Sequence, residues 1–560
     1  RNTLSIMKSV INGSLNYAVH PLKYLSINPA SSVSLPSKNA TPDIPTRIKQ
    51  RDVVPEHILD LIFKRFPENS TAYIPLNFGY LCGMRHAEAF AVDIDNDVDF
   101  KNGVLHLTHQ LQFINGHWTL KAPKYNSVRD IDLNTRMINI LKNTLNKNRE
   151  YYIKKLVDFV KIDTHVLGHG IDGGLEDEGQ KYLINLFEEM DADIIEKENI
   201  KESVIEKSIK KYNEGNPGHN YDNRYNVYAT FKGLSKKSIM FNGHVDTMPS
   251  GDISLWDSNP HSADIRDNKI YGLGVCDMKG GLMAGIMSVA LLKQSGIELP
   301  LNVYITAVCD EEGGGNGSIM AAMSGKKADA VIVCEPSDRE IIAAHMGFIF
   351  FRVEVAGISV HSGSKWNGVS AIDKAIKIIN AINELEHNWL LKYKHALLPP
   401  PNLNVGVING GKAGSTVPDY CKFEVCIHYL PNIMSYEQVV SEFTNTINMC
   451  SIGDSWLKNN IPKITIYQSG GSFEMGLNNS FINVIKKSYL EVYNESPKVV
   501  GSPAGCDSRT WNNIAKCPTL QYGPGSIKQC HTVNEYLDIN EYLETILLYS
   551  NIIINFANEN

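Results

Sequence analysis

Seven side chains with nitrogen or oxygen donors for metal ions lie between residues 244 and 531. They are His244, Asp246, Asp277, Glu311, Glu312, Glu335 and His531. Any one of them alone would more often be a cap or a buried polar group with a partner. As a set they predict a centre for two divalent metal ions. Because none is a thiolate, zinc fits best, with cobalt or manganese as alternatives.

The spacing of two pairs in this set predicts different tasks for neighbouring side chains. His244 and Asp246 are two residues apart, so in an extended strand they share a face, and the carboxylate can orient the imidazole. Glu311 and Glu312 are adjacent and therefore point in different directions. One of them can hold a metal ion while the other faces the reacting water.

The elements that must position these residues alternate between strands and helices after about residue 148. Apolar segments at 225–231, 237–246, 301–312 and 328–336 predict strands, and the segment 279–293 predicts a helix between two of them. This alternation is typical of an α/β domain around a mixed, largely parallel sheet, which carries its site at the carboxyl ends of the strands. The candidate ligands stand at such ends.

Eight ordered blocks strengthen this interpretation over residues 150 to 560. They are GHVDTMP, GLGVCDMKGG, DEEGGGNG, VCEPSD, VHSG, LNVGVINGG, VPDYC and YGPGSIKQCHTVNE. With these blocks the segment resembles the M20 metallopeptidase family, in its branch of acetylornithine deacetylase and succinyl-diaminopimelate desuccinylase. The resemblance implies a two-metal aminopeptidase-like catalytic domain at residues 148–340 and 454–560. It also implies an inserted α+β lid and dimerisation domain at residues 341–453.

The resemblance also implies roles for the candidate residues. Asp277 would bridge two ions, with the other ligands divided between them: His244 and Glu335 for one, Glu312 and His531 for the other. Glu311 would be the general base, and Asp246 would support His244. The alternative is a family member that has lost its metal centre and serves only as a scaffold, which would bind no metal.

By the same resemblance the lid pairs two subunits into a homodimer. His361, in the block VHSG, would then reach the active site of the partner subunit and stabilise the tetrahedral oxyanion. Considered alone, His361 fits a local turn contact equally well.

Two positions depart from the family pattern, and both belong to its substrate and oxyanion contacts. Ser415 precedes VPD where the family usually has Asn, and His428 stands in IHYLP where the family usually has Arg. Arg509, in CDSR, matches a family block and could bind a carboxylate. These departures put the identity of the substrate in doubt more than the type of reaction.

The expected reaction is hydrolysis of the amide bond of an N-acyl amino acid or short peptide, beside a small carboxylate-bearing group. Water bound to the metal centre would lose a proton to Glu311 and attack the carbonyl carbon. Glu311 would then return the proton to the leaving nitrogen.

The first 147 residues carry a second and separate resemblance. GMRHAE and APKYNSVRDIDL resemble the blocks around the first catalytic Arg and the catalytic Lys of a phage-type tyrosine recombinase, or integrase, which would be Arg85 and Lys124. This implies an α+β recombinase-like fragment, whose hairpin turns at Asn115-Gly116. The family's later His-x-x-Arg box and Tyr nucleophile are missing before the second domain begins. We therefore expect Arg85 and Lys124 to be structural cations and no DNA strand to be cut.

Charge separates the same two parts of the chain. Residues 1–150 hold 18 Lys and Arg against 13 Asp and Glu, a balance of +5, and because the whole chain carries −7, the remainder carries −12. Weak DNA binding through residues 1–147 is consistent with this balance. The alternative function is therefore a DNA-binding or recombination protein with an appended hydrolase, and a gel shift with and without residues 1–147 would separate the two.

Ten cysteines are scattered without paired spacing or any CxxC, which favours a reducing cytoplasm over a disulfide scaffold. Cys276, Cys334 and Cys530 each precede a candidate ligand. We interpret them as packed cysteines and not as ligands. No run of 18 or more apolar residues predicts a membrane span.

Overall fold

The chain divides into two units, residues 1–140 and 141–560, and each is described by itself. The structure is a computed structural model, which describes residues 62, 64–66, 70, 73–81, 84–99, 104–114, 117–123 and 128–559. Helix α6 (Leu133–Lys147) spans the point of division. The sequence places this boundary at residue 147, where the helix ends.

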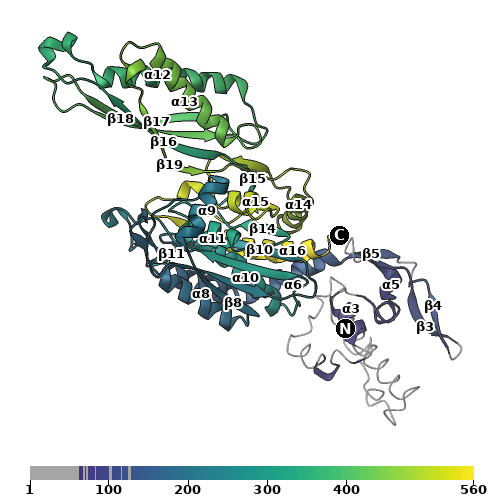
Figure 1. The fold of residues 1–560 in the computed structure, drawn as a ribbon. Coiled ribbons are helices and arrows are strands. Elements are labelled where there is room, and N and C mark those ends of the chain that lie inside the picture. The colour runs from purple at the N-terminus through teal and green to yellow at the C-terminus, as the bar shows by residue number, and fades with distance from the viewer. Residues whose placement is uncertain are drawn as a thin grey trace. The chain divides into compact units, whose positions relative to one another are not determined.

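A nine-stranded mixed sheet forms the centre of the second unit (Figure 1). Its order is β20 (Phe473–Glu474), β15 (Ile341–His345), β22 (Thr519–Gln521), β14 (Ala330–Val333), β10 (Ser238–His244), β13 (Asn302–Val308), β9 (Tyr225–Phe231) and β8 (Ile194–Asn199), with β21 (Val499–Ser502) paired to β15. The four central strands, from β22 to β13, are parallel. The strands outside them pair antiparallel along this path. This confirms the predicted α/β fold with a mixed sheet.

Burial on both faces explains the continuous apolar sequence of the central strands. Every residue of β10 is buried, as is typical of a strand covered by helices on both sides. The chain leaves β10 through α10 (Gly280–Gln294) to β13 on one side, then returns through α11 (Asn316–Met323) to β14 on the other. Because such crossovers are right-handed, α10 and α11 cover opposite faces of the sheet.

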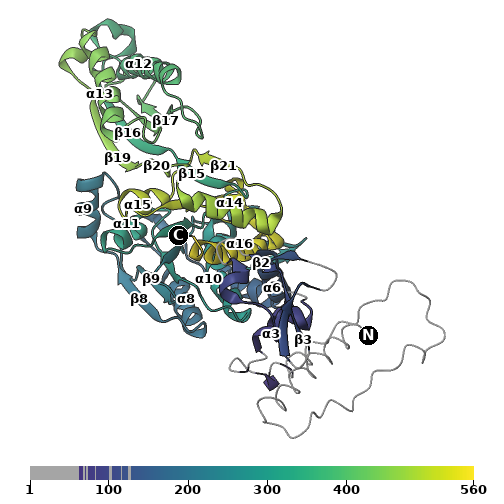
Figure 2. The same cartoon turned by 90° about the vertical axis from the view of Figure 1, so that its right-hand side faces the viewer.

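Helix α10 is among the most apolar helices of this unit, and its residues from Gly280 to Leu292 are all buried. It packs against α16 (Ile539–Ala557), which in turn packs against α14 (Ser480–Tyr493), as Figure 2 shows. Among the described residues, the segment Val275–Gln294 has the length and composition to cross a membrane, but it is entirely buried inside the protein. Its position between the sheet and α16 accounts for its composition.

A four-stranded antiparallel sheet forms a separate layer of the second unit. Its order is β17 (Asn402–Gly410), β18 (Tyr420–Tyr429), β16 (Gly347–Ala356) and β19 (Lys463–Gly470). In β16 every second residue is buried, so one face forms a core. Helices α12 (Ala371–Lys392) and α13 (Tyr436–Ile452) pack against each other and contribute to that core (Figure 1).

The limits of this small sheet differ from the predicted lid segment 341–453 at both ends. Residues 341–345 form β15, which pairs with strands of the large sheet. Residues 463–470 form β19, which pairs with β16 of the small sheet. Strand partners are long-range contacts, so the local sequence pattern does not reveal to which sheet a strand belongs.

The first unit contains a three-stranded sheet, β1 (Val98–Asp99), β2 (Val104–Leu107) and β5 (Arg129–Asp132), and a hairpin. The hairpin joins β3 (Gln110–Ile114) to β4 (His117–Lys121), with Ile114 opposite His117. The hairpin predicted around Asn115-Gly116 is therefore confirmed, although these two residues lie outside the described ones. Helices α3 (Tyr73–Leu81), α4 (His86–Ala89) and α5 (Ile94–Asp97) complete the described elements of this unit before α6.

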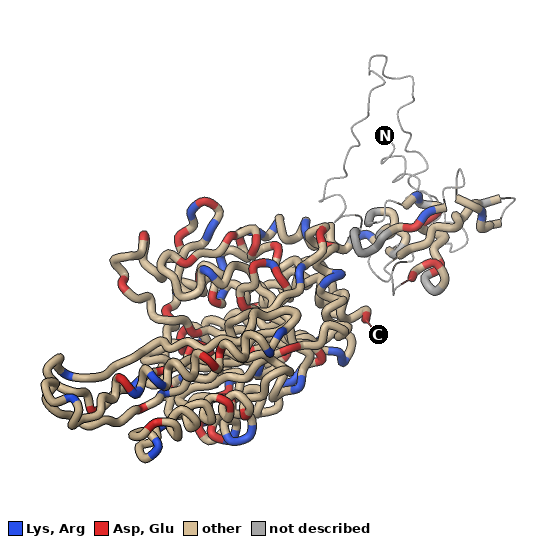
Figure 3. The backbone as a smooth tube through the Cα atoms, turned by 90° about the horizontal axis from the view of Figure 1, so that it is seen from above, with Lys and Arg blue, Asp and Glu red and all other residues tan. Residues whose placement is uncertain are grey.

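Acidic and basic residues are interspersed along the second unit, and neither sign is confined to one segment (Figure 3). Its net charge of −10, which is the −7 of the whole chain less the +3 of residues 1–140, is therefore distributed over many elements.

We expect a chain that begins at Leu141 to fold as the second unit does in the full protein. This unit owns its hydrophobic core, the nine-stranded and four-stranded sheets and all seven candidate ligands. Circular dichroism should show a cooperative thermal transition within about 4 °C of the corresponding transition in the full chain. Aggregation, or a loss of the cooperative transition, would show that the second unit depends on residues 1–140.

Candidate active site

The sheet brings the candidate ligands to the carboxyl ends of its parallel strands. His244 is the last residue of β10, Glu311 and Glu312 follow β13, and Glu335 follows β14. Asp277 lies in the turn Val275–Lys279 before α10, and His531 follows a short helical turn at Ile527–Gln529. Because β10, β13 and β14 are parallel neighbours, their carboxyl ends share one edge of the sheet.

Asp277 lies between the two histidines. Its Oδ1 is 3.1 Å from Nε2 of His244, and its Oδ2 is 3.4 Å from Nε2 of His531. Glu312 Oε2 lies 3.0 Å from Nε2 of His531. Each oxygen of one carboxylate therefore faces a different imidazole, as a ligand shared by two ions requires.

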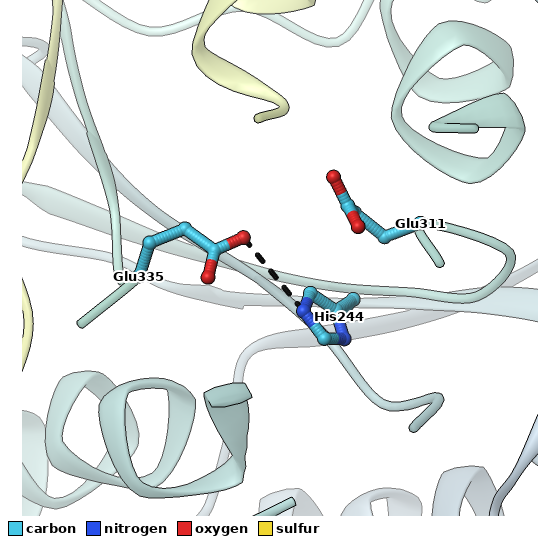
Figure 4. Close-up of side chains that lie close together, drawn as sticks. All are labelled: His244, Glu311 and Glu335. Atoms are coloured by element: carbon cyan, nitrogen blue, oxygen red, sulfur yellow. Dashed lines mark ion pairs between the residues drawn. The ribbon is translucent and has the colours of Figure 1, made fainter. Parts of the chain in front are cut away.

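Two further carboxylates approach His244 from other strands (Figure 4). Glu335 Oε1 lies 3.7 Å from Nε2 of His244. The ligand atoms of His244, Glu311 and Glu335 lie within 4.8 Å of one another, as do those of His244, Asp277 and Glu312. The structure thus brings together six of the predicted residues.

Burial makes this concentration of carboxylates unfavourable without a cation. It raises the pKa of Glu311 well above the usual range, and nearby Asp507 adds to the effect. Burial likewise raises the pKa of Glu335 and Glu312, with a further contribution from Asp277. The cluster therefore favours protons or metal ions over bare negative charge.

Asp277 and His531 show the opposite effect. Burial would raise the pKa of Asp277, but hydrogen bonds with His244 and His531 lower it below its usual value. Hydrogen bonds with Asp277 and Glu312 raise the pKa of His531 to about 10. Asp277 therefore differs from the three glutamates, because two imidazoles stabilise its charged form.

Asp246 supports the site differently from the sequence-based expectation. Nδ1 of His244 lies 2.8 Å from the main-chain oxygen of Asp246 and 3.8 Å from its carboxylate. The Asp246 carboxylate instead accepts the backbone N–H of Glu312 at 3.0 Å. Asp246 therefore orients the imidazole through its main chain and the glutamate loop through its side chain.

Gly281 allows the first turn of α10 to approach the strand that carries Glu335. A Cβ atom on Gly281 would lie 1.8 Å from the carbonyl oxygen of Cys334. No side chain fits there, so the glycine of this turn sets the distance between the Asp277 turn and β14.

Glu535 is a buried carboxylate that is not among the candidate residues predicted from the sequence. It accepts the backbone N–H groups of Gly274 at 2.7 Å, Cys276 at 2.7 Å and Asp277 at 3.0 Å. Burial, with a contribution from Asp277, raises its pKa to about 8. It thereby fixes the turn that presents Asp277. Its only sequence signal is its position in the block that contains His531.

A buried ion network supports the glutamate loop from behind. Arg224 forms ion pairs with Glu176 and with Asp310, the residue before Glu311. Nδ1 of His219 lies 2.8 Å from the other oxygen of Asp310. All four side chains are almost fully buried, and nothing in their sequence spacing marks them as a group.

A cavity of about 410 Å³ adjoins the ligands. Its wall includes Phe348 of β16, Gln468 of β19, Ser502 of β21, Gln521 of β22 and Arg509 of α15 (Ser508–Asn513). Of the three predicted substrate contacts, Arg509 lines this cavity, whereas Ser415 and His428 do not.

The structure places Ser415, His361 and His428 on the small-sheet layer. The backbone N–H of Ser362 donates to the carbonyl of Ser415, and His361 pairs with Thr416 in a β-bridge. His361 is exposed and lies outside the cavity lining. His428 belongs to β18, where its Nδ1 lies 3.2 Å from Oδ1 of Asn402.

The three cysteines beside ligands differ in exposure. Cys276 and Cys334 are buried, as the interpretation of packed cysteines requires, whereas Cys530 is partly exposed and lines the cavity.

In the first unit, Arg85 donates to Glu88 at 3.2 Å, and Arg129 donates to the same buried carboxylate at 3.0 Å. Both arginines therefore have a structural contact. Lys124 lies outside the described residues.

Comparison with known proteins finds one family profile, described as peptidase family M20/M25/M40, which matches residues 240–555. The N-formyl-4-amino-5-aminomethyl-2-methylpyrimidine deformylase of Halalkalibacterium halodurans is 31% identical over 356 residues, covering 59% of this chain and 83% of that protein. The acetylornithine deacetylase of Photorhabdus laumondii is 30% identical over 345 residues, covering 60% of this chain and 84% of that protein.

Solved structures show the same fold at lower identity. The dipeptidase Dug1p of Saccharomyces cerevisiae matches with a TM-score of 0.58 and 16% identity, over 75% of this chain and 99% of its own. The M20 metallo-carboxypeptidase Sso-CP2 of Sulfolobus solfataricus matches with a TM-score of 0.57 and 20% identity, over 72% of this chain and 99% of its own.

Replacing Glu535 by Gln should weaken metal binding while the protein stays folded. An amide has one acceptor oxygen and presents an NH₂ group to the three N–H donors, so the Asp277 turn loses its fixed position. We expect metal affinity to fall by about tenfold or more. Titration with a competing chelator measures this. Glu386→Gln is the matched control, since Glu386 also accepts a backbone N–H, from Leu403, on the small-sheet layer. Unchanged affinity in Glu535→Gln would contradict the positioning role.

Proposed function

Because the chain belongs to the M20/M25/M40 peptidase family, we propose that this hydrolase of amide bonds holds two divalent metal ions and removes a short acyl group from an amine. The observation that carries the proposal is the position of Asp277 between His244 and His531, with three further carboxylates around it.

The donor set fits divalent cations. Four carboxylates and two imidazoles converge from separate strands and turns, and burial raises the pKa of three of those carboxylates. Asp277 would be shared by both ions, with the remaining ligands divided between them: His244 and Glu335 for one, Glu312 and His531 for the other. Nitrogen and oxygen donors of this kind favour zinc, with cobalt or manganese as alternatives.

Glu311 is the residue that moves protons in this proposal. Divalent ions, when bound, lower the pKa of water and polarise a carbonyl group. Glu311 lies within 4.8 Å of the ligand atoms of His244 and Glu335, so its carboxylate can reach a water held between them. Because its pKa is raised, Glu311 can accept a proton from the water and then return it to the leaving nitrogen.

The named activities of the relatives suggest the acyl group. One is a deformylase and the other a deacetylase, so we propose an N-formyl or N-acetyl amine as the substrate class. Short peptides are the alternative substrates.

We also propose that the small-sheet layer pairs two subunits. Strand β17 is an edge strand of this sheet, and its Val407 and Ile408 are 42% and 49% exposed. An edge strand with exposed apolar side chains offers a surface for a second copy. In such a dimer His361 would stabilise the oxyanion at the active site of the partner subunit.

The recombinase resemblance of residues 1–147 stays a prediction. The family match begins at residue 240, and the described contacts of Arg85 and Arg129 with Glu88 are structural. We propose that this segment contributes nothing to the hydrolysis, because it owns none of the ligands.

Zinc-loaded protein should release formate or acetate from a panel of N-formyl and N-acetyl amines. Mass spectrometry of the reaction mixtures measures this release. Glu311→Gln should lower kcat by about a hundredfold or more, because proton transfer is removed while the ligands stay. Elemental analysis should still find two metal ions in this variant. If metal content falls instead, the roles of Glu311 and Glu312 are exchanged.

Asp277→Asn should lose both metal ions together, since one carboxylate is proposed to serve each of them. Asp252→Asn is the matched control, because Asp252 is an exposed carboxylate that caps a helical turn outside the ligand set. A full pair of ions in Asp277→Asn, measured by elemental analysis, would exclude the bridging role.

A further inference from the structure

The cavity beside the ligands has little positive charge to offer a substrate. Its ionisable lining consists of four carboxylates, Arg509 and His531, apart from the Cys530 and Cys506 thiols. His531 faces Asp277 and Glu312, so it belongs to the metal site. Among the lining residues, Arg509 is therefore the one fixed cation that could bind a carboxylate of the substrate.

Arg509 is already engaged inside the protein. Its Nε donates to Glu214 at 3.1 Å, Nη1 donates to the carbonyl of Cys506 at 2.8 Å, and Nη2 donates to the carbonyl of Gly314 at 3.1 Å. The Arg509 and Glu214 side chains are 2% and 3% exposed. A substrate carboxylate that displaced Glu214 from this guanidinium would leave Glu214 as a buried carboxylate without its cation, with the backbone N–H of Gly471 as its remaining described partner, which is strongly unfavourable.

His428 offers no replacement. It stands where the resembling family has Arg, but on β18 it contacts Cys426 of the same strand and Asn402 of β17. Burial lowers its pKa, which disfavours the charged imidazolium that would bind a carboxylate. Arg509 and His428 are the two positions at which the sequence suggests a contact with a substrate carboxylate. Neither of them therefore supplies a free positive charge.

The rest of the wall suits a neutral group with some apolar surface. The ring of Phe348 lies 5.7 Å from the guanidinium of Arg509, and Ile527 adds a second apolar contact. Ser502, Gln468 and Gln521 contribute hydroxyl and amide groups, which hydrogen-bond neutral partners. The positive charge of two divalent ions would be balanced by the four carboxylates of the lining. No excess positive charge would then remain to attract a fifth carboxylate, that of the substrate.

We propose that the amine portion of the substrate is uncharged and carries a planar or apolar group, so that the enzyme prefers neutral N-acyl amines of this kind to N-acyl amino acids. This inference rests on the proposed function as an N-deacylase. It differs from the expectation that the scissile amide lies beside a carboxylate.

The test compares three substrates that differ at one position. They are N-formylbenzylamine, its 4-carboxamide and its 4-carboxylate, of which the carboxamide controls for size. We expect kcat/KM for each of the two neutral compounds to exceed that for the carboxylate by about tenfold or more, mainly through KM. Calorimetry with the zinc-loaded Glu311→Gln protein should show the same order of affinity without turnover.

A variant that adds a cation to the cavity tests the cause of this preference. Gln468→Lys should raise kcat/KM for the carboxylate relative to the carboxamide by about tenfold. Gln112→Lys is the control, because Gln112 is exposed on the first unit and carries the same change of charge.

The outcomes separate the two proposals. If wild-type protein hydrolyses the 4-carboxylate as well as or better than the carboxamide, the inference is wrong and the proposed function stands. If zinc-loaded protein hydrolyses none of the three compounds and no member of the N-acyl amine panel, the proposed function fails and the inference fails with it.

Discussion

The position of Asp277 between two imidazoles is the constraint on which the rest of the second unit depends. In the proposed centre each oxygen of this carboxylate would face one ion, and the Oδ atoms lie 3.1 and 3.4 Å from Nε2 of His244 and of His531, respectively. The two histidines come from distant parts of the chain. Each therefore needs its own support: β10 ends at His244, and the segment after β22 must return to the same edge of the sheet to present His531.

The support is built mainly from hydrogen bonds to the main chain. Glu535 holds three N–H groups of the Asp277 turn, and Asp246 holds the N–H of Glu312 while its carbonyl faces His244. A side chain that binds backbone groups fixes the path of a loop, whereas one that binds another side chain fixes only a rotamer. This arrangement suits ligands that must keep their positions in a buried site where their charges repel.

Several of these features could be predicted from the sequence, because they depend on local pattern. The apolar strands predict a largely parallel sheet, and His244, Glu311 and Glu335 stand at the carboxyl ends of three of those strands, so their convergence follows from the topology of the fold. What the sequence could not supply depends on long-range pairing. β19 joins β16 across about a hundred residues, and Glu214 reaches Arg509 across nearly three hundred, so neither partner is marked by local spacing. Asp246 shows an intermediate case, since its spacing predicts contact with His244 but not which of its oxygens makes it.

The distribution of buried charge links the fold to the chemistry. Arg224 and Arg509 are buried cations close to the glutamate loop, and each is paired with a carboxylate that is not a ligand: Glu176 and Asp310 for Arg224, and Glu214 for Arg509. Because these cations are already neutralised, they do little to offset the negative charge of the ligand cluster. The negative charge of that cluster is consequently available to divalent ions, and the lining of the cavity beside it holds no free cation. In the proposed enzyme, the same pairing that keeps the ligands available for metal would also set which substrates can approach them, so metal binding and selectivity would share one electrostatic origin.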